Sequence, residues 1–396
     1  MTITDANLAE RPRPSFAILV VISGIGPLAL NLLVPSMPGL EKSFGVPYGT
    51  VQLTLTLYLI GMAVCQLIYG PASDRFGRRP LLLAGLSLFF IASVLAAIAP
   101  SIETLIAARL IQAIGGSAGI VLARAMVRDV FSREKSASVI SYITMAFVVA
   151  PMIAPVLGGL LEQYAGWRTG FWLLAAVGAS VLSAAWITLP ETHTDRAAGS
   201  QNFFRNAGKL FALPRFRGYA FTLAFTSCVF FAFLGGAPHI MIDILQRPPL
   251  EYGLWFATIS AAYMVGNFLS GHYTQKVGID RMIMAGCIVT ICGGFLCLAA
   301  AISGLLSPPT LFIPMALAAF GNGLTIPNGT AGAISVDPRM TGAAAGWSGF
   351  TQMGFGAAAS QLVGSLQNTW PFAVFWFMAV ASMLAFFTHW RSLRVN

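Results

Sequence analysis

Apolar runs long enough to cross a lipid bilayer recur along the whole chain, and they leave few folds open. Windows of about 19 residues yield about twelve such runs. A bilayer offers the backbone no hydrogen-bond partners, so a spanning segment must be a helix or a strand of a closed barrel. The runs are rich in Gly, Ala and Leu and lack the ten-residue alternation of barrel strands. We therefore predict an all-α integral membrane protein with twelve transmembrane helices. The runs cover residues 16–37, 50–69, 81–99, 104–125, 139–161, 171–189, 218–242, 252–272, 282–305, 310–333, 342–366 and 372–387.

Charge is sparse and unevenly distributed. Charged residues make up 9% of the chain, too few for a soluble protein of 396 residues. With twelve spans and both termini on one side, only Lys42, Arg168 and Arg247 fall on the other side, and Arg109 lies within a span. By the positive-inside rule, both termini are cytoplasmic. The net charge of +9 thus reflects orientation in a membrane, and we expect no nucleic-acid partner.

A polar segment divides the chain in two. Residues 190–217 separate six spans from six, so we predict an N-terminal half over 1–189, a cytoplasmic linker and a C-terminal half over 218–396. A weak repeat supports this division, because Gly271 and Gly278 follow the eighth span with the same spacing as Gly70 and Gly77 after the second. Repeated halves that meet near the bilayer midplane are typical of alternating-access transporters.

Four short segments stand at particular places among these spans. The charged turn Gly70–Pro80 joins the second and third spans, and Val34–Pro38 closes the first. The fourth span contains Arg109–Gly116, and the fifth contains Ala150–Gly159. Together these segments resemble the signatures of the major facilitator superfamily, in its drug:proton antiporter group, and within that group the Bcr/CflA type of bacterial efflux transporter.

This resemblance implies a function and roles for particular residues. It implies a secondary transporter that exports small amphipathic molecules or antibiotics by alternating access, coupled to protons. It assigns a conformational latch to the turn, in which Arg75 or Arg78 pairs with Asp129 and Asp74 faces a helix N-terminus of the other half. The latch residues are Gly70, Asp74, Arg75, Gly77, Arg78 and Asp129, and the antiporter motif of the fifth span is Pro151, Pro155, Gly158 and Gly159.

The fourth span carries the one basic residue at depth. Arg109 shares a helix face with Gln112, Gly116 and Gly119. An ionisable side chain there is costly unless it faces a cavity or a partner, so we predict a coupling or substrate role for Arg109 with Gln112. In the fifth span, the two prolines and Gly158-Gly159 predict a bent helix that allows close backbone approach.

The chain departs from the family at Asn31, where the first span normally carries a proton-binding Asp. None of the 14 acidic residues lies well inside a predicted span, and Glu41, Glu103, Glu162, Asp243 and Glu251 fall at periplasmic ends. Two explanations stay open. Protons could bind His239 with Asp243, four residues apart on the seventh helix. Alternatively, Arg109 binds an anionic or zwitterionic metabolite or siderophore, with Asn31 and Gln112 completing a polar cluster.

Other candidates for a central cavity are polar or aromatic residues at mid-depth. They are Tyr58, Phe230, Phe233, Asn322, Asn328 and Gln352. A mostly apolar cavity with a few polar groups is the usual design of a small-molecule site. No nucleophile–base pair or ligand cluster assembles from the four dispersed histidines, so we expect no enzyme, no metal and no cofactor. The partners we expect are a small-molecule substrate, protons and the lipid bilayer, and we expect a monomer.

Overall fold

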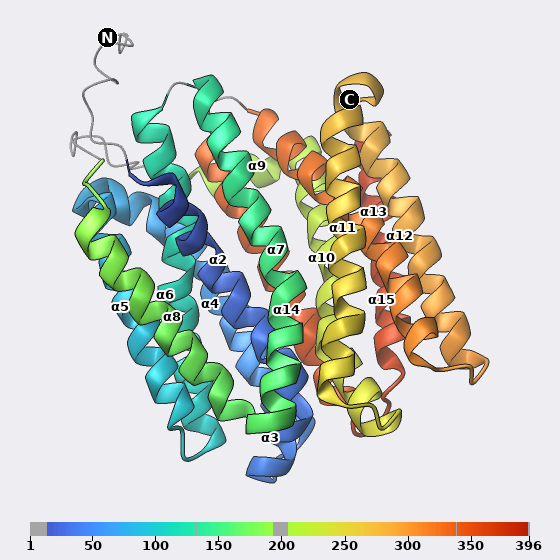
Figure 1. The fold of residues 1–396 in the computed structure, drawn as a ribbon. Coiled ribbons are helices and arrows are strands. Elements are labelled where there is room, and N and C mark those ends of the chain that lie inside the picture. Colours follow the sequence, from blue (N-terminus) through green and yellow to red (C-terminus); the bar gives the residue numbers. More distant parts are fainter. Residues whose placement is uncertain (1–13, 132, 193–204, 338, 395–396) are drawn as a thin grey trace, which may run out of the picture.

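The structure is a computed structural model, and it describes residues 14–131, 133–192, 205–337 and 339–394. The chain folds into long helices that run roughly parallel to one another (Figure 1). Up to residue 188 the elements are α2 (Phe16–Leu32), η1 (Val34–Ser36), α3 (Met37–Phe44), α4 (Tyr48–Phe76), α5 (Arg78–Ala97), α6 (Ile102–Val130), α7 (Arg133–Ala165) and α8 (Trp167–Thr188). After residue 204 they are α9 (Arg205–Ala212), α10 (Pro214–His239), the π-helical η2 (Ile240–Ile244), α11 (Pro249–Val277), α12 (Ile279–Ile302), α13 (Pro308–Ser335), α14 (Thr341–Leu366) and α15 (Ala373–Arg394).

The helices pack as two groups. We call α2–α8 the first half and α10–α15 the second half. Within the first half, α6 packs against α2, α4 and α5, and within the second half α13 packs against α10, α11 and α12. The halves meet where α4 packs on α14 and where α7 packs on α11. The start of α2 and the end of α15 lie at one end of the bundle, the terminal end, whereas α3 lies at the opposite, distal end (Figure 1).

Nine helices in the described part of the chain are long and apolar enough to cross a membrane. The helices α7, α11 and α14 are not among the nine, although each has at least 26 residues. All three lie at the contact between the halves. The interface helices α11 and α14 contain many Gly, Ser, Thr, Asn and Gln residues, which permit close packing but lower the mean hydropathy. A multi-pass membrane protein is thus established, and the full number of twelve spans stays a prediction.

The charged turn after the second span is shorter than predicted. Helix α4 continues through Gly70 and Pro71 to Phe76, and α5 begins at Arg78. The predicted turn Gly70–Pro80 was therefore wrong in its length, because most of its residues are helical. Only Gly77 breaks the helix, with a φ of 96° that side chains rarely tolerate. Gly278 has a φ of 94° between α11 and α12, so the repeat seen in the sequence corresponds to the same backbone turn in both halves.

The predicted linker is attached to both halves at its ends, and its residues 193–204 lie outside the described residues. At its start, the Glu191 carboxylate accepts hydrogen bonds from the backbone N–H groups of Arg78 and Arg79, at 3.1 and 3.2 Å. These are free donors of the first turn of α5, so Glu191 caps this helix. At its other end, Leu210 of α9 is buried in an apolar cluster of the second half.

Candidate functional site

Arg109 lies at the centre of the first half with no exposed surface. Its Nη1 donates to the Ala29 carbonyl of α2 at 3.1 Å and to Oε1 of Gln112 at 2.6 Å. Its guanidinium lies 4.1 Å from the ring centroid of Tyr58 and 5.9 Å from that of Phe171. The cation is thus held by carbonyl oxygens and ring faces in a desolvated site, where such contacts are strongest. Its Nη2 has no hydrogen-bond partner among the described residues.

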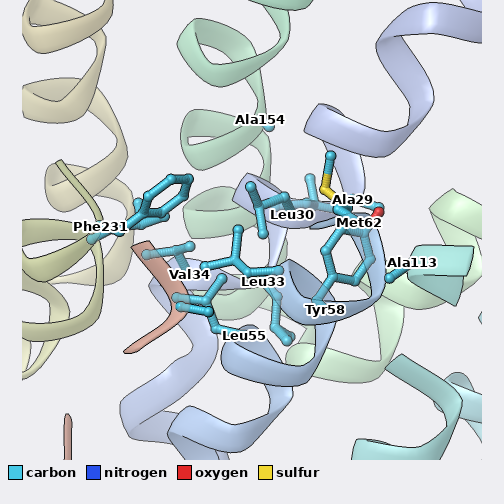
Figure 2. Packing of buried hydrophobic residues seen from close by; sticks show 14 of the residues in the cluster. Ala29, Leu30, Leu33, Val34, Leu55, Tyr58, Met62, Ala113, Ala154 and Phe231 are labelled. Carbon is cyan, nitrogen blue, oxygen red and sulfur yellow. The ribbon is translucent and has the colours of Figure 1, made fainter. Parts of the chain in front are cut away.

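The residues around Arg109 form a chain of hydrogen bonds that spans four helices. Gln112 passes the contact on to α5, because its Nε2 donates to Ser93 Oγ at 2.8 Å. The Tyr58 hydroxyl of α4 donates to the Gly26 carbonyl of α2 at 3.0 Å. Figure 2 shows Tyr58 beside Ala29, Met62 and Ala113 within the apolar packing. We call Arg109, Gln112, Tyr58, Ser93 and Phe171 the arginine cluster. It is a fixed positive charge that ties α2, α4, α5 and α6 together.

Asn31 does not complete this cluster as predicted. Its Nδ2 donates to the Pro27 carbonyl of its own helix at 2.9 Å, and its Oδ1 is buried without a hydrogen-bond partner in the part of the chain that the structure describes. Within the described ranges no carboxylate contacts Arg109. Sequence reasoning paired Arg109 with Gln112 correctly from their spacing and named Tyr58, but it missed Ser93 and Phe171. These two are a small polar and an apolar residue on other helices, and no local signal marks them.

Side-chain hydrogen bonds join the two halves at the distal end. The Tyr48 hydroxyl donates to the Gly235 carbonyl at 3.0 Å, and Gln52 Nε2 donates to Ser360 Oγ at 2.6 Å. Further along α4, Thr56 Oγ1 donates to Oε1 of Gln361 at 2.8 Å. These bonds are buried or half-buried, so they close the distal end between α4 of the first half and α10 and α14 of the second.

His239 and Asp243 belong to this distal contact and not to the arginine cluster. His239 Nδ1 lies 3.1 Å from Asp243 Oδ2, and Lys42 Nζ of the first half lies 2.9 Å from Asp243 Oδ1. The ligand atoms of Glu41, His239 and Asp243 lie within 4.8 Å of one another, close enough to hold a metal ion. The Lys42 ammonium already neutralises Asp243, however, and it bridges the halves as an ion pair.

The glycines of the fifth-span motif allow two backbones to touch. A Cβ at Gly158 would overlap the Leu32 carbonyl of α2, within the first half. A Cβ at Gly159 would overlap the Pro249 carbonyl of α11, in the second half. In return, a Cβ at Gly253 of α11 would overlap the Pro155 carbonyl. The motif containing Pro151 and Pro155 therefore lies on the seam between the halves.

The predicted latch residues gather at the terminal end, within one half. The Arg78 side chain is 9% exposed and lies between two acids, with Nη1 2.6 Å from Asp74 Oδ1 and Nε 3.1 Å from Asp129 Oδ2. The structure thus selects Arg78 over Arg75 as the partner of Asp129. In this structure Asp74 pairs with Arg78 of its own half, and its predicted contact with a helix N-terminus of the other half, which belongs to the form closed at the terminal end, stays a prediction. Arg78 and Asp129 both belong to the first half. Their ion pair joins elements of a single half, so it does not require that the terminal end be closed.

The remaining candidates lie in the second half, mostly as packing residues. Phe233 is fully buried, with its ring centroid 5.5 Å from that of Phe312, and Phe230 contacts Phe231 and Phe256. Asn322 accepts a hydrogen bond from Thr290, and Asn328 donates to Ser270 at 2.7 Å. Both asparagines therefore join helices to one another. Gln352 is half-buried on α14.

Comparison with known proteins identifies the family of this two-half helical architecture. The chain belongs to the major facilitator superfamily. The family model described as "Major Facilitator Superfamily" matches its residues 19–361. The relatives place it with the Bcr/CflA-type members of the drug:proton antiporter group. The "Multidrug resistance protein D" of Escherichia coli (strain K12) is 30% identical, over 88% of this chain and 84% of its own. The "Bicyclomycin resistance protein homolog" of Haemophilus influenzae is 29% identical over 88% of both chains. Among solved structures, a D-xylose-proton symporter matches the fold with a TM-score of 0.79 at 15% identity, over 95% of this chain and 96% of the other.

Proposed function

We propose that this protein is a secondary transporter of the bacterial inner membrane that exports small amphipathic molecules, antibiotics among them, in exchange for protons. The observation that carries this proposal is the set of hydrogen bonds between the halves at the distal end. Two packed halves that bond to each other at one end are the arrangement that alternating access requires, because breaking those bonds lets the halves rock apart. Members of the family are transporters, and an enzymatic activity is not part of this proposal.

The excess of Lys and Arg gives the sidedness. It places both termini, and thus the terminal end with Arg78 and Asp129, in the cytoplasm, and the distal end at the periplasm. The structure then corresponds to the form closed towards the periplasm. Twelve spans are part of the same proposal, because an even number returns the chain to the side on which it began.

The substrate class rests on the relatives, which are named for resistance to bicyclomycin and to multiple drugs. We test it with bicyclomycin and with ethidium, a lipophilic cation, in a bacterium lacking its own efflux pumps. Expression should raise the bicyclomycin concentration that stops growth, and a protonophore should abolish energy-dependent export of the compound. Unchanged growth on both compounds, with the protein present in the membrane, would disprove the drug-export proposal.

A second candidate is export of an anionic or zwitterionic compound. It is favoured by Arg109, which contacts no carboxylate within the described ranges and has a free Nη2. A substrate anion that reached Nη2 would complete the coordination of the guanidinium. Binding of anionic compounds that is lost in Arg109→Lys, alongside unchanged ethidium binding, would support this candidate over the first.

A further inference from the structure

Glu162 is an acidic side chain that the sequence places at the periplasmic end of the fifth span and that the structure turns inward. It lines a narrow cavity between α2, η1, α7 and α8, together with Leu32, Ser36 and Phe171. The cavity has about 10 Å³ of room for the centre of a water molecule, enough for about one water. Glu162 Oε2 is buried there and has no hydrogen-bond partner in the described structure.

The backbone around Glu162 is shaped to admit its carboxyl group. A Cβ at Gly39 of α3 would overlap Glu162 Oε1 in its present position, so glycine at this position leaves room for the carboxyl. One helix turn before Glu162, Gly158 brings α7 against the Leu32 carbonyl. Ser36 of η1 lines the same cavity and brings its hydroxyl close to the carboxyl. Three elements thus close around one acidic group.

No cation of the described residues pairs with this acid within its cavity. Among the described residues that line the cavity, Glu162 is the only one that titrates. The charged groups on the elements packed around it have other contacts: Lys42 of α3 pairs with Asp243, Arg168 of α8 donates to the Ala99 carbonyl, and Glu41 of α3 accepts from Asn368. Glu251 lies in the first turn of α11, which packs on α7, and Tyr164 is exposed. A carboxyl with a sealed, unpaired oxygen is more stable in its neutral form, that is, with a proton bound.

The cavity also lies where the two transport forms differ and close to the arginine cluster. Gly159, three residues before Glu162, packs on Pro249 of the second half, so opening the distal end uncovers this part of α7. On the inner side, Phe171 lines the cavity and also lies 5.9 Å from the Arg109 guanidinium. Phe171 therefore belongs both to the lining of the Glu162 cavity and to the arginine cluster.

We propose that Glu162 is the proton-binding carboxyl of this transporter, in place of the acid that Asn31 does not supply. In the form open at the distal end, the carboxylate oxygen takes a proton from the periplasmic side. In the closed form described here, Glu162 carries that proton as a neutral acid beside Phe171, and release of the proton towards the cytoplasmic side restores the carboxylate for the next cycle. This inference rests on the proposed proton-coupled export, and it replaces His239 with Asp243 as the proton site, since Lys42 already neutralises Asp243.

The test compares Glu162→Gln, which keeps the shape and removes the titration, with Glu103→Gln, a matched change at an exposed glutamate of the same end. Infrared difference spectra of the purified full chain, recorded across a pH step, report carboxyl protonation without any substrate. The protonated-carboxyl band should disappear in Glu162→Gln and remain in Glu103→Gln. A band that survives in Glu162→Gln would overturn the proposal.

Two further measurements complete the test. In inverted membrane vesicles, Glu162→Gln should lower bicyclomycin uptake driven by a pH gradient at least tenfold and leave exchange without a gradient intact; unchanged gradient-driven uptake would refute the proposal. Ser36→Ala removes only the neighbouring hydroxyl, which favours the ionised carboxylate, so the pH midpoint of the infrared titration should rise. This variant also serves if Glu162→Gln does not fold, because an unmoved midpoint would count against Glu162. If wild-type vesicles move no bicyclomycin, only the export proposal is refuted. The infrared result tests separately whether Glu162 binds a proton.

Discussion

Gly159→Ala should open the distal end, because Gly159 is a contact between the halves with no space for a side chain. A Cβ at this position would come 2.8 Å from the Pro249 carbonyl carbon and 2.9 Å from the Leu250 Cα, and it would overlap the Pro249 carbonyl oxygen. All three atoms belong to the backbone, so no side-chain rotation relieves the overlap. The second half must move away from α7, and this is the movement that opens the distal end.

The size of the effect follows from the cost of overpacking, about 1–3 kcal/mol for added methyl-sized groups in a packed interior. This cost falls on the distal-closed form alone, because the open form separates Gly159 from Pro249. A free-energy difference of about 1–3 kcal/mol changes an equilibrium by about 5- to 150-fold. The ratio of distal-open to distal-closed molecules should therefore rise by that factor.

Double electron–electron resonance between spin labels at Ser43 and Thr369 measures this ratio from the distribution of label-to-label distances. Both residues are exposed at the distal end, and they lie in different halves. The control is Gly158→Ala, which adds the same atom one residue earlier and overlaps the Leu32 carbonyl inside the first half. It should lower thermal stability without changing the ratio. Identical distance distributions in Gly159→Ala and wild type would refute the assignment of this contact to the closed form.

Two other predictions follow from the buried cations. Arg109→Lys should lower transport at least tenfold and stability by about 1–3 kcal/mol, because a single Nζ cannot reproduce the contacts of the guanidinium to Gln112 and the rings; wild-type uptake and melting temperature would contradict this. Asp74→Asn and Asp129→Asn should each cost about 1 kcal/mol, since Arg78 keeps the other acid, whereas the double variant should exceed their sum by about 0.5–3 kcal/mol; additive melting data would show that the two acids do not share Arg78.

The fold could be predicted from the sequence where a single physical rule dominates. Length and hydropathy locate the apolar runs. The equal spacing within the two glycine pairs, Gly70 with Gly77 and Gly271 with Gly278, indicates the repeat. Helix ends were harder, because Pro71 suggests a break that α4 does not make. A helix that leaves the membrane gains continued backbone hydrogen bonds at little cost, so it ends at Gly77, where the backbone requires a positive φ.

The site could be predicted only where its members share one helix. Arg109 and Gln112 are three residues apart, and this spacing brings their side chains together. Contacts between helices could not be predicted without knowing how the helices pack. Such contacts involve Ser93 of α5, Phe171 of α8, and Gly39 of α3 beside Glu162 of α7. Glu162 was assigned to a periplasmic end by its position along the chain, but the direction of its side chain depends on how closely α3 approaches α7.

The contacts of Asn31 on the first helix bear on the proposal that Glu162, and not an acid of the first helix, binds the proton. The Asn31 side-chain amide donates its hydrogen bond to the Pro27 carbonyl, and the side chain is 2% exposed. An ionised Asp at this position would face that carbonyl without a donor, so it would need Arg109 as a partner. Yet Nη1 of Arg109 is already engaged by Ala29 and Gln112, both neutral acceptors. Nη1 of Arg109 therefore needs no carboxylate partner. In the mechanism that we propose, the proton binds a group outside the arginine cluster, and that group is Glu162.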